Sequence, residues 1–231
     1  VMTAISLLIP ILCVSRFQLV FAVLLAAFTY ISLQKLFHPG WLFGLFVVMI
    51  PFYLILTVAR SHNIEYLNGI FEMKNASMPI FVSQPYIYIA NNYDNFNCLV
   101  GALPGHSFGL KGLFPLWALS GLKFFFPQLI NFPIYVDKTE LTTLTLFYDS
   151  YYDFGWIGVL LFSCVLGAIA YILVVKLREM RNPLGYLLYA QFAAYLMLSF
   201  FTTWFSNTTT WFYLILTGIM ALFYHLRASR W

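Results

Sequence analysis

Two carboxylates stand four residues apart where a polar loop meets a long apolar run. Asp149 and Asp153 belong to the stretch TLFYDSYYDFGWIGVLLF, and a spacing of four lets one helical face present both. A carboxylate placed in this way can accept a proton from a hydroxyl group during a transfer reaction. Asp153 has a simpler interpretation, because it directly precedes the apolar run and predicts an N-cap that the helix dipole stabilises. Asp149 is explained less well by capping and is the candidate for direct chemistry.

Aromatic and amide side chains gather in the same part of the chain. Tyrosine and tryptophan at a membrane boundary are ordinary interfacial anchors. The alternative is that the rings stack on sugars, while neighbouring amides, which both donate and accept hydrogen bonds, bind sugar hydroxyls. The residues that could contact a sugar in this way are Tyr88, Asn92, Tyr93, Asn95 and Tyr152.

Three further residues have side chains that could take part in a reaction. Arg60 ends an apolar run, and its planar fork could bind two phosphate oxygens, although snorkelling to the membrane surface is an equally ordinary role. His106, in PGHSFG, could be a base, although a histidine in such a loop is more often only a polar residue. Asp94 is a third candidate base, and the sequence leaves open the choice among Asp94, His106 and Asp149.

The composition indicates which elements must position these groups. Of the 231 residues, 62% are hydrophobic and 9% are charged, whereas about 25% of a soluble domain is charged. Several apolar runs reach the length of about 18 residues that crosses a bilayer. We therefore predict an all-α polytopic integral membrane protein. The net charge of +4 is no sign of nucleic-acid binding, because in a membrane protein the distribution of charge is what matters.

About six transmembrane helices are predicted, with one long loop between the third and the fourth. They cover residues 2–15, 17–34, 41–59, 154–175, 184–204 and 211–226. The chain then divides into transmembrane helices over 1–59, a large loop over 60–153, and transmembrane helices over 154–231. The sequence opens on Val1 within an apolar segment, which favours a piece of a longer protein.

The distribution of charge predicts the orientation of the spans. The loop 60–153 holds seven of the eight acidic residues but five of the twelve basic ones. Six basic residues in short segments fall together on the other side: Lys35, Lys176, Arg178, Arg181, Arg227 and Arg230. Because short cytoplasmic loops are rich in Lys and Arg, we place the C-terminus in the cytoplasm and the large loop outside it. Arg16 is the one exception.

The apolar segment 108–136 of the large loop is too interrupted for a span. Lys111, Lys123 and three prolines break it. A single crossing here would also put the later basic segments on the wrong side of the membrane. We therefore expect an interfacial or re-entrant helix within the extracytoplasmic loop.

No metal or cofactor site is predicted. The three cysteines, Cys13, Cys98 and Cys164, are far apart, and the four histidines are scattered. The sequence has no zinc spacing, no phosphate-binding glycine loop and no dinucleotide fingerprint.

Five stretches together carry a resemblance to a known family. They are TVARS (57–61), YIYIANNYDNFNCLV (86–100), GHSFGLKGLFPLW (105–117), TELTTLTLFYDSYYDFGWIG (139–158) and VLGAIAY (165–171). The most specific is the tyrosine and Asp-Phe-Gly-x-x-Gly run that opens a span after a long external loop. On these stretches the chain resembles the C-terminal half of the oligosaccharide repeat-unit polymerases (O-antigen polymerases, the Wzy family), over about residues 50–228. Such enzymes usually have ten or more spans.

The resemblance implies a membrane glycosyltransferase that builds a bacterial capsule, O-antigen or exopolysaccharide. A growing glycan would pass from undecaprenyl diphosphate to a new lipid-linked repeat unit, on the outer face of the bacterial cytoplasmic (inner) membrane. The departing lipid diphosphate needs a cation to bind it. Arg60 is the first candidate for this role, and Lys74 and Lys138 are the alternatives. The partners implied are the lipid-linked oligosaccharide, membrane lipids, a repeat-unit flippase and a chain-length regulator, without nucleic acid or cofactor.

Three other interpretations stay open. An O-antigen ligase would share the architecture but use a different acceptor. A polysaccharide or lipid transporter (flippase) predicts ionisable residues within spans, whereas the six spans above have none in their interiors. An assembly protein would need no catalytic groups.

Overall fold

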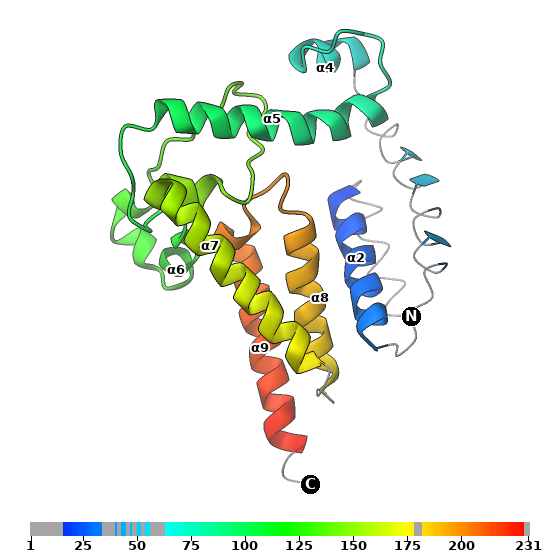
Figure 1. The fold of residues 1–231 in the computed structure, drawn as a ribbon, viewed down its shortest axis with the longest axis vertical. Coiled ribbons are helices and arrows are strands. Elements are labelled where there is room, and N and C mark those ends of the chain that lie inside the picture. Colours follow the sequence, from blue (N-terminus) through cyan, green and yellow to red (C-terminus); the bar gives the residue numbers. More distant parts are fainter. Residues whose placement is uncertain are drawn as a thin grey trace. The chain divides into compact units, whose positions relative to one another are not determined.

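The computed structural model describes residues 16–33, 63–177 and 182–228, and a few positions between 40 and 55. Within these residues the chain has seven α-helices and no strand, which confirms the predicted all-α class. The helices are α2 (Arg16–Leu33), α4 (Ile64–Ile70), α5 (Ile80–Ala102), α6 (Phe114–Leu119), α7 (Tyr148–Leu177), α8 (Pro183–Met197) and α9 (Thr208–Ala228) (Figure 1). Three 3-10 turns complete the set: η1 (Leu122–Phe124), η2 (Pro127–Leu129) and η3 (Trp204–Ser206).

The chain divides into two compact units, residues 1–87 and 88–231, and the boundary falls within α5. In the first unit, Asn63 caps α4 because its side chain accepts a hydrogen bond from the Tyr66 backbone N–H. Asn68 is buried in the same helix, and its amide donates to two backbone carbonyls of the following turn, those of Ala76 and Met78.

In the second unit, α8 packs against both α7 and α9, as Figure 1 shows. Two helices there are long and apolar enough to cross a membrane, over Tyr148–Lys176 and Thr208–Arg227. They contain the spans predicted at 154–175 and 211–226. Most of their large apolar side chains are exposed, as expected for helices whose surroundings are lipid rather than water.

The other predicted spans are not confirmed by the residues that the structure describes. The span 2–15 lies outside the described residues, and most of 41–59 does too. The apolar part of α2 is the shorter Val20–Leu33. Helix α8 has 15 residues and is therefore about 22 Å long, short of the roughly 30 Å hydrocarbon core. The six-span topology stays a prediction.

Helix α8 ends before the predicted residue 204 because hydroxyl groups take over the backbone bonding. The Ser199 hydroxyl donates to the carbonyl of Tyr195, at 2.7 Å, and the Thr202 hydroxyl donates to the carbonyl of Phe201, also at 2.7 Å. Such side-chain bonds compete with the helical pattern. The chain then turns through η3 and enters α9 at Thr208.

The large loop is more ordered than the sequence indicated. Helix α5 has 23 residues and includes Pro85, yet sequence analysis predicted only loop here. The segment 108–136, where an interfacial or re-entrant helix was predicted, contains one short α-helix, and its position relative to a membrane stays a prediction. It forms the six-residue α6 and two 3-10 turns, because Gly121 adopts a left-handed φ of 78° and Pro127 starts a new turn.

Candidate functional site

The first turns of α7 lie in a core made of aromatic rings. Leu99 of α5, Tyr148 and Tyr152 are its buried centre. The Tyr148 hydroxyl donates to the carbonyl of Tyr135, at 2.8 Å, and accepts from the backbone N–H of the same residue, at 2.7 Å. One phenol therefore holds the loop before α7 onto the start of that helix, and satisfies both polar groups of Tyr135.

A buried ion pair lies beside this core. The Lys111 ammonium is 3.7 Å from Oδ1 of Asp149, and the two side chains are 12% and 8% exposed. The hydroxyl-bearing side chains of Thr203 and Ser206, from the α8–α9 connection, lie next to the same carboxylate. Three segments distant in sequence thus meet at one carboxylate, where exclusion of water strengthens every electrostatic interaction.

Aromatic rings enclose the cation of this pair. The Lys111 ammonium is 4.7 Å from the ring centroid of Tyr152, 5.7 Å from that of Tyr148 and 5.9 Å from that of Phe132. Ring faces carry negative potential and attract a cation at such distances. The Lys111–Asp149 pair is therefore a preorganised cation and a preorganised base side by side. Such an arrangement can stabilise a developing anion and accept a proton.

Asp153 does not cap the apolar helix, which corrects the sequence-based prediction. It lies in the turn before the kink of α7, and its two oxygens accept from the backbone N–H of Lys111, at 3.1 Å, and of Gly112, at 2.7 Å, rather than from the apolar helix. The Ser107 hydroxyl donates to it as well. A buried carboxylate with these donors fixes the loop 107–112, and so it also fixes the backbone that carries the Lys111 ammonium.

Steric constraints explain why glycine occupies both positions of the Asp-Phe-Gly-x-x-Gly run, and also position 112. Helix α7 is kinked at Phe154 and at Gly155, whose φ of 62° and ψ of −149° suit only glycine. At Gly158 a Cβ atom would collide with the Ser150 carbonyl oxygen, because the kink brings the first turn against the next one. At Gly112 a Cβ atom would be 2.6 Å from Asp153 Oδ2.

His106 lies at this kink and is exposed. Its Nδ1 is 3.3 Å from the Tyr152 carbonyl oxygen, and its ring meets the edge of Tyr151 at 6.2 Å between centroids. The proposed role of His106 as a base stays a prediction.

The asparagines of α5 hold the chain's own loops. The Asn95 amide donates to the carbonyls of Leu141, at 2.7 Å, and Thr143, at 2.8 Å, while its oxygen accepts from the Asp137 N–H, at 2.9 Å. Asn92 donates to the carbonyl of Phe200, at 2.7 Å. These asparagines are buried, and backbone carbonyls of the chain occupy their donors. Their predicted sugar contact is untested.

The remaining predicted site residues are more open. Tyr93 and Asp94 are exposed on α5, and so is Tyr88, whose ring lies 6.0 Å from that of Phe201. Lys138 is half-buried. Arg60, the first choice for diphosphate, lies outside the described residues.

The structure thus brings together two of the predicted site residues, Asp149 and Tyr152, and adds one that sequence reasoning missed. Lys111 had been noted only as an interruption of an apolar segment. A lone lysine among apolar residues, in GLKGLF, was the available signal, because a buried ammonium needs a partner.

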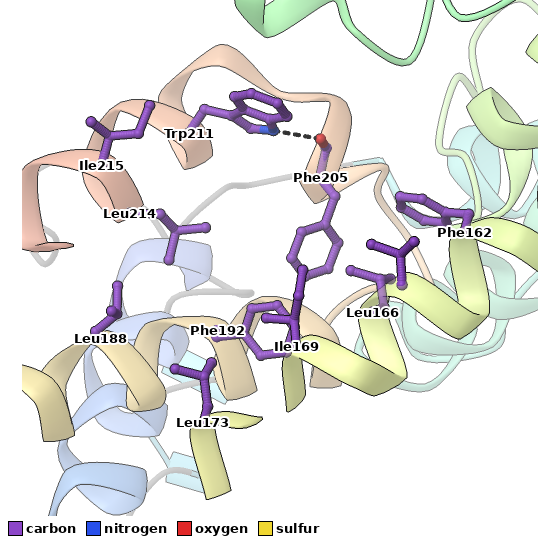
Figure 2. Close-up of a pocket in the computed structure, with 11 residues that line it drawn as sticks. Phe162, Leu166, Ile169, Leu173, Leu188, Phe192, Phe205, Trp211, Leu214 and Ile215 are labelled. Atoms are coloured by element: carbon purple, nitrogen blue, oxygen red, sulfur yellow. Dashed lines mark hydrogen bonds between the residues drawn. The ribbon is translucent and has the colours of Figure 1, made fainter. Parts of the chain in front are cut away.

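An apolar cavity of about 440 Å³ lies between α7, α8 and α9. Figure 2 shows Leu166 and Ile169 of α7, Phe192 of α8 and Leu214 of α9 around it. Trp211 closes one end by donating from its indole N–H to the Phe205 carbonyl, at 2.7 Å. Its lining is apolar and its volume suits a hydrocarbon chain.

The part of the chain that the structure describes has no group of three or more His, Cys, Asp or Glu side chains that could hold a metal ion. Comparisons with protein-family models, with curated proteins and with solved structures found no match to this chain.

Proposed function

We propose that this protein transfers glycans between lipid-linked oligosaccharides at a membrane surface, as a polymerase of repeat units carried on a polyprenyl diphosphate. The observation that carries the proposal is the buried Lys111–Asp149 pair among aromatic rings, at the start of an apolar helix. A glycosyl transfer from a diphosphate needs a base for the incoming hydroxyl and positive charge for the departing anion. The pair supplies one of each.

The position of the pair along α7 supports a reaction at the membrane surface. Helix α7 has 30 residues and is therefore about 45 Å long, which exceeds the roughly 30 Å hydrocarbon core. The part after the kink at Gly155 is long enough to cross on its own. The turn that carries Asp149 then lies at the boundary, where the sugar and the diphosphate of a lipid-linked substrate meet water.

In the proposed reaction, the hydroxyl oxygen of the acceptor sugar bonds to the anomeric carbon of the donor glycan. The bond between that carbon and the diphosphate oxygen breaks, and its electron pair leaves with the lipid diphosphate. Asp149 accepts the hydroxyl proton. The Lys111 ammonium offsets the negative charge that develops on the leaving group. Arg60 would add a bidentate hydrogen-bonded contact to the same diphosphate.

The surroundings of the pair also support a lipid-linked substrate. The apolar cavity between α7, α8 and α9 is of a size and character to hold part of a polyprenyl chain. Exposed rings at the loop surface, such as that of Tyr93, offer faces on which sugars could stack. Transfer would proceed on the extracytoplasmic face of the bacterial cytoplasmic membrane, where charge distribution places the large loop.

A double replacement separates chemistry from structural support. Lys111→Met with Asp149→Leu removes both charges and keeps apolar volume, so the fold should survive. We expect membrane abundance near that of the unchanged protein but no polysaccharide ladder, with single repeat units accumulating on the lipid carrier. The measurement is a glycan ladder beside a quantitative blot of the same cells.

Glu140→Gln is the matched control, because that carboxylate is exposed, lies outside the pair and is not a candidate base. The ladder of this variant should be normal. A normal ladder for the double replacement at full abundance would refute the catalytic role of the pair.

One observation favours a transporter as the second candidate. Asp149 belongs to a helix that, taken whole, is a candidate membrane span, and buried ionisable groups in spans often mark transport pathways. The same cells distinguish the two functions. Loss of a flippase leaves single repeat units on the cytoplasmic leaflet, whereas loss of a polymerase leaves them on the outer leaflet, where an added glycosidase can reach them.

A further inference from the structure

A turn of three consecutive phenylalanines projects from the second unit. Phe124 and Phe125 are 77% and 79% exposed, and Phe126 is exposed too. Such exposure of neighbouring large rings is unusual for a surface in water and marks an interaction site.

The backbone N–H groups of the three phenylalanines are paired within the turn. The N–H of Phe124 donates to the Gly121 carbonyl, and those of Phe125 and Phe126 both donate to the Leu122 carbonyl. Gly121 makes the turn possible through its left-handed φ, and Pro127 begins the next one. A turn whose N–H groups are bonded internally enters an apolar medium at a lower cost than a turn whose N–H groups lack acceptors.

A cation accompanies the rings. The Lys123 ammonium lies 5.1 Å from the centroid of the Phe124 ring. Rings beside a basic group are typical of segments that lie in the interface of a bilayer, with the rings among the acyl chains and the ammonium among anionic phosphates.

The turn is continuous with the apolar helices. Helix α6, directly before it, packs against α9, one of the two candidate spans. The loop directly before α6 contacts α7 near its beginning, because the Gly112 N–H donates to Asp153, and the exposed Trp156 follows on the same helix. The same bilayer that surrounds α7 and α9 would thus reach the phenylalanine turn.

We propose that the phenylalanine turn (Phe124, Phe125 and Phe126) inserts into the bilayer leaflet on the side of the large loop, with Lys123 at the lipid phosphates. The turn anchors the loop that carries Lys111 to the membrane surface. The occupant of this apolar surface is lipid, and the inference does not depend on the reaction proposed above.

Spin labels test the depth of the turn. The native cysteines are replaced by serine, and single cysteines are introduced as Phe125→Cys, Leu161→Cys and Asp94→Cys. Each labelled protein is placed in nanodiscs of phosphatidylethanolamine and phosphatidylglycerol. Collision with oxygen, which concentrates in lipid, is compared with collision with a water-soluble nickel chelate.

The label at position 125 should collide more often with oxygen than with the nickel chelate, as the reference label at position 161, on the exposed apolar surface of α7, is expected to do. The label at position 94, exposed on α5, should collide more often with the nickel chelate than with oxygen. A nickel-accessible label at 125 would overturn the inference by placing the turn in water. Weak collision with both reagents would overturn it in favour of a protein partner, and added dipolar broadening would identify that partner as a second copy.

A charge reversal sharpens the result. Lys123→Glu should move the label at 125 toward the nickel reagent in discs that contain phosphatidylglycerol. In discs of phosphatidylcholine alone, which carry no net charge, the shift should be smaller. An equal shift in both lipids would contradict the phosphate contact of Lys123.

Discussion

Asp149 and Asp153 are one turn apart on the same helix and both are buried, yet their surroundings differ in kind. Asp153 receives two backbone N–H groups and a hydroxyl, so its charge holds a loop in place. Asp149 faces a lysine ammonium among rings. Backbone donors are part of the architecture, whereas a side-chain cation can exchange its partner for a substrate. The difference separates a carboxylate that holds a loop in place from one that the proposed reaction could use.

The largest expected effect comes from breaking the turn that carries both carboxylates. Gly158→Val should prevent folding, because its side chain would collide with the Ser150 carbonyl and open the kink of α7. Gly167→Val is the matched control, since this glycine of the same helix has open space around its Cβ position. Fluorescence-detected size-exclusion chromatography in detergent should show a folded peak for Gly167→Val alone. Equal peaks for the two variants would contradict the packing described for Gly158.

A smaller effect is expected at the architectural carboxylate. Asp153→Asn turns one oxygen into an NH2 group, and a donor then faces the N–H of either Lys111 or Gly112. The buried N–H left without an acceptor should lower the free energy of unfolding by about 1–3 kcal/mol. The melting temperature of the purified protein measures this loss. If Asp153 were only a helix cap, asparagine would serve nearly as well and the melting temperature would not change.

The smallest effect on stability is expected when the Lys111–Asp149 pair is removed as a whole. Lys111→Met with Asp149→Leu leaves no buried charge unpaired, so we expect the free energy of unfolding to change by no more than about 1 kcal/mol. The same melting experiment compares this double replacement with Asp153→Asn directly. A larger loss for the double replacement than for Asp153→Asn would reverse the comparison. It would show that the ion pair supports the fold more than the loop contacts do.

Parts of this site were accessible to sequence reasoning and parts were not. Asp149 and Tyr152 were identified because acids and rings before an apolar run are a local pattern. Lys111 was missed, and Asp153 was predicted to be the N-cap of the apolar helix, because the partners of both residues are distant in sequence. Asp153 is bound by the backbone N–H groups of Lys111 and Gly112. Almost every residue has such a group, so the residue types in the sequence could not predict this contact.

The sequence by itself determined the apolar helices α7 and α9, because hydrophobicity summed over about 20 residues is a local quantity. It also determined where α7 can kink, since only glycine tolerates the backbone angles at position 155. Only the tertiary structure decided that Lys111 meets Asp149 and that the asparagines of α5 bind loop carbonyls. Those contacts depend on how a long loop folds back onto α7, and many distant contacts must form together before any one of them is stable.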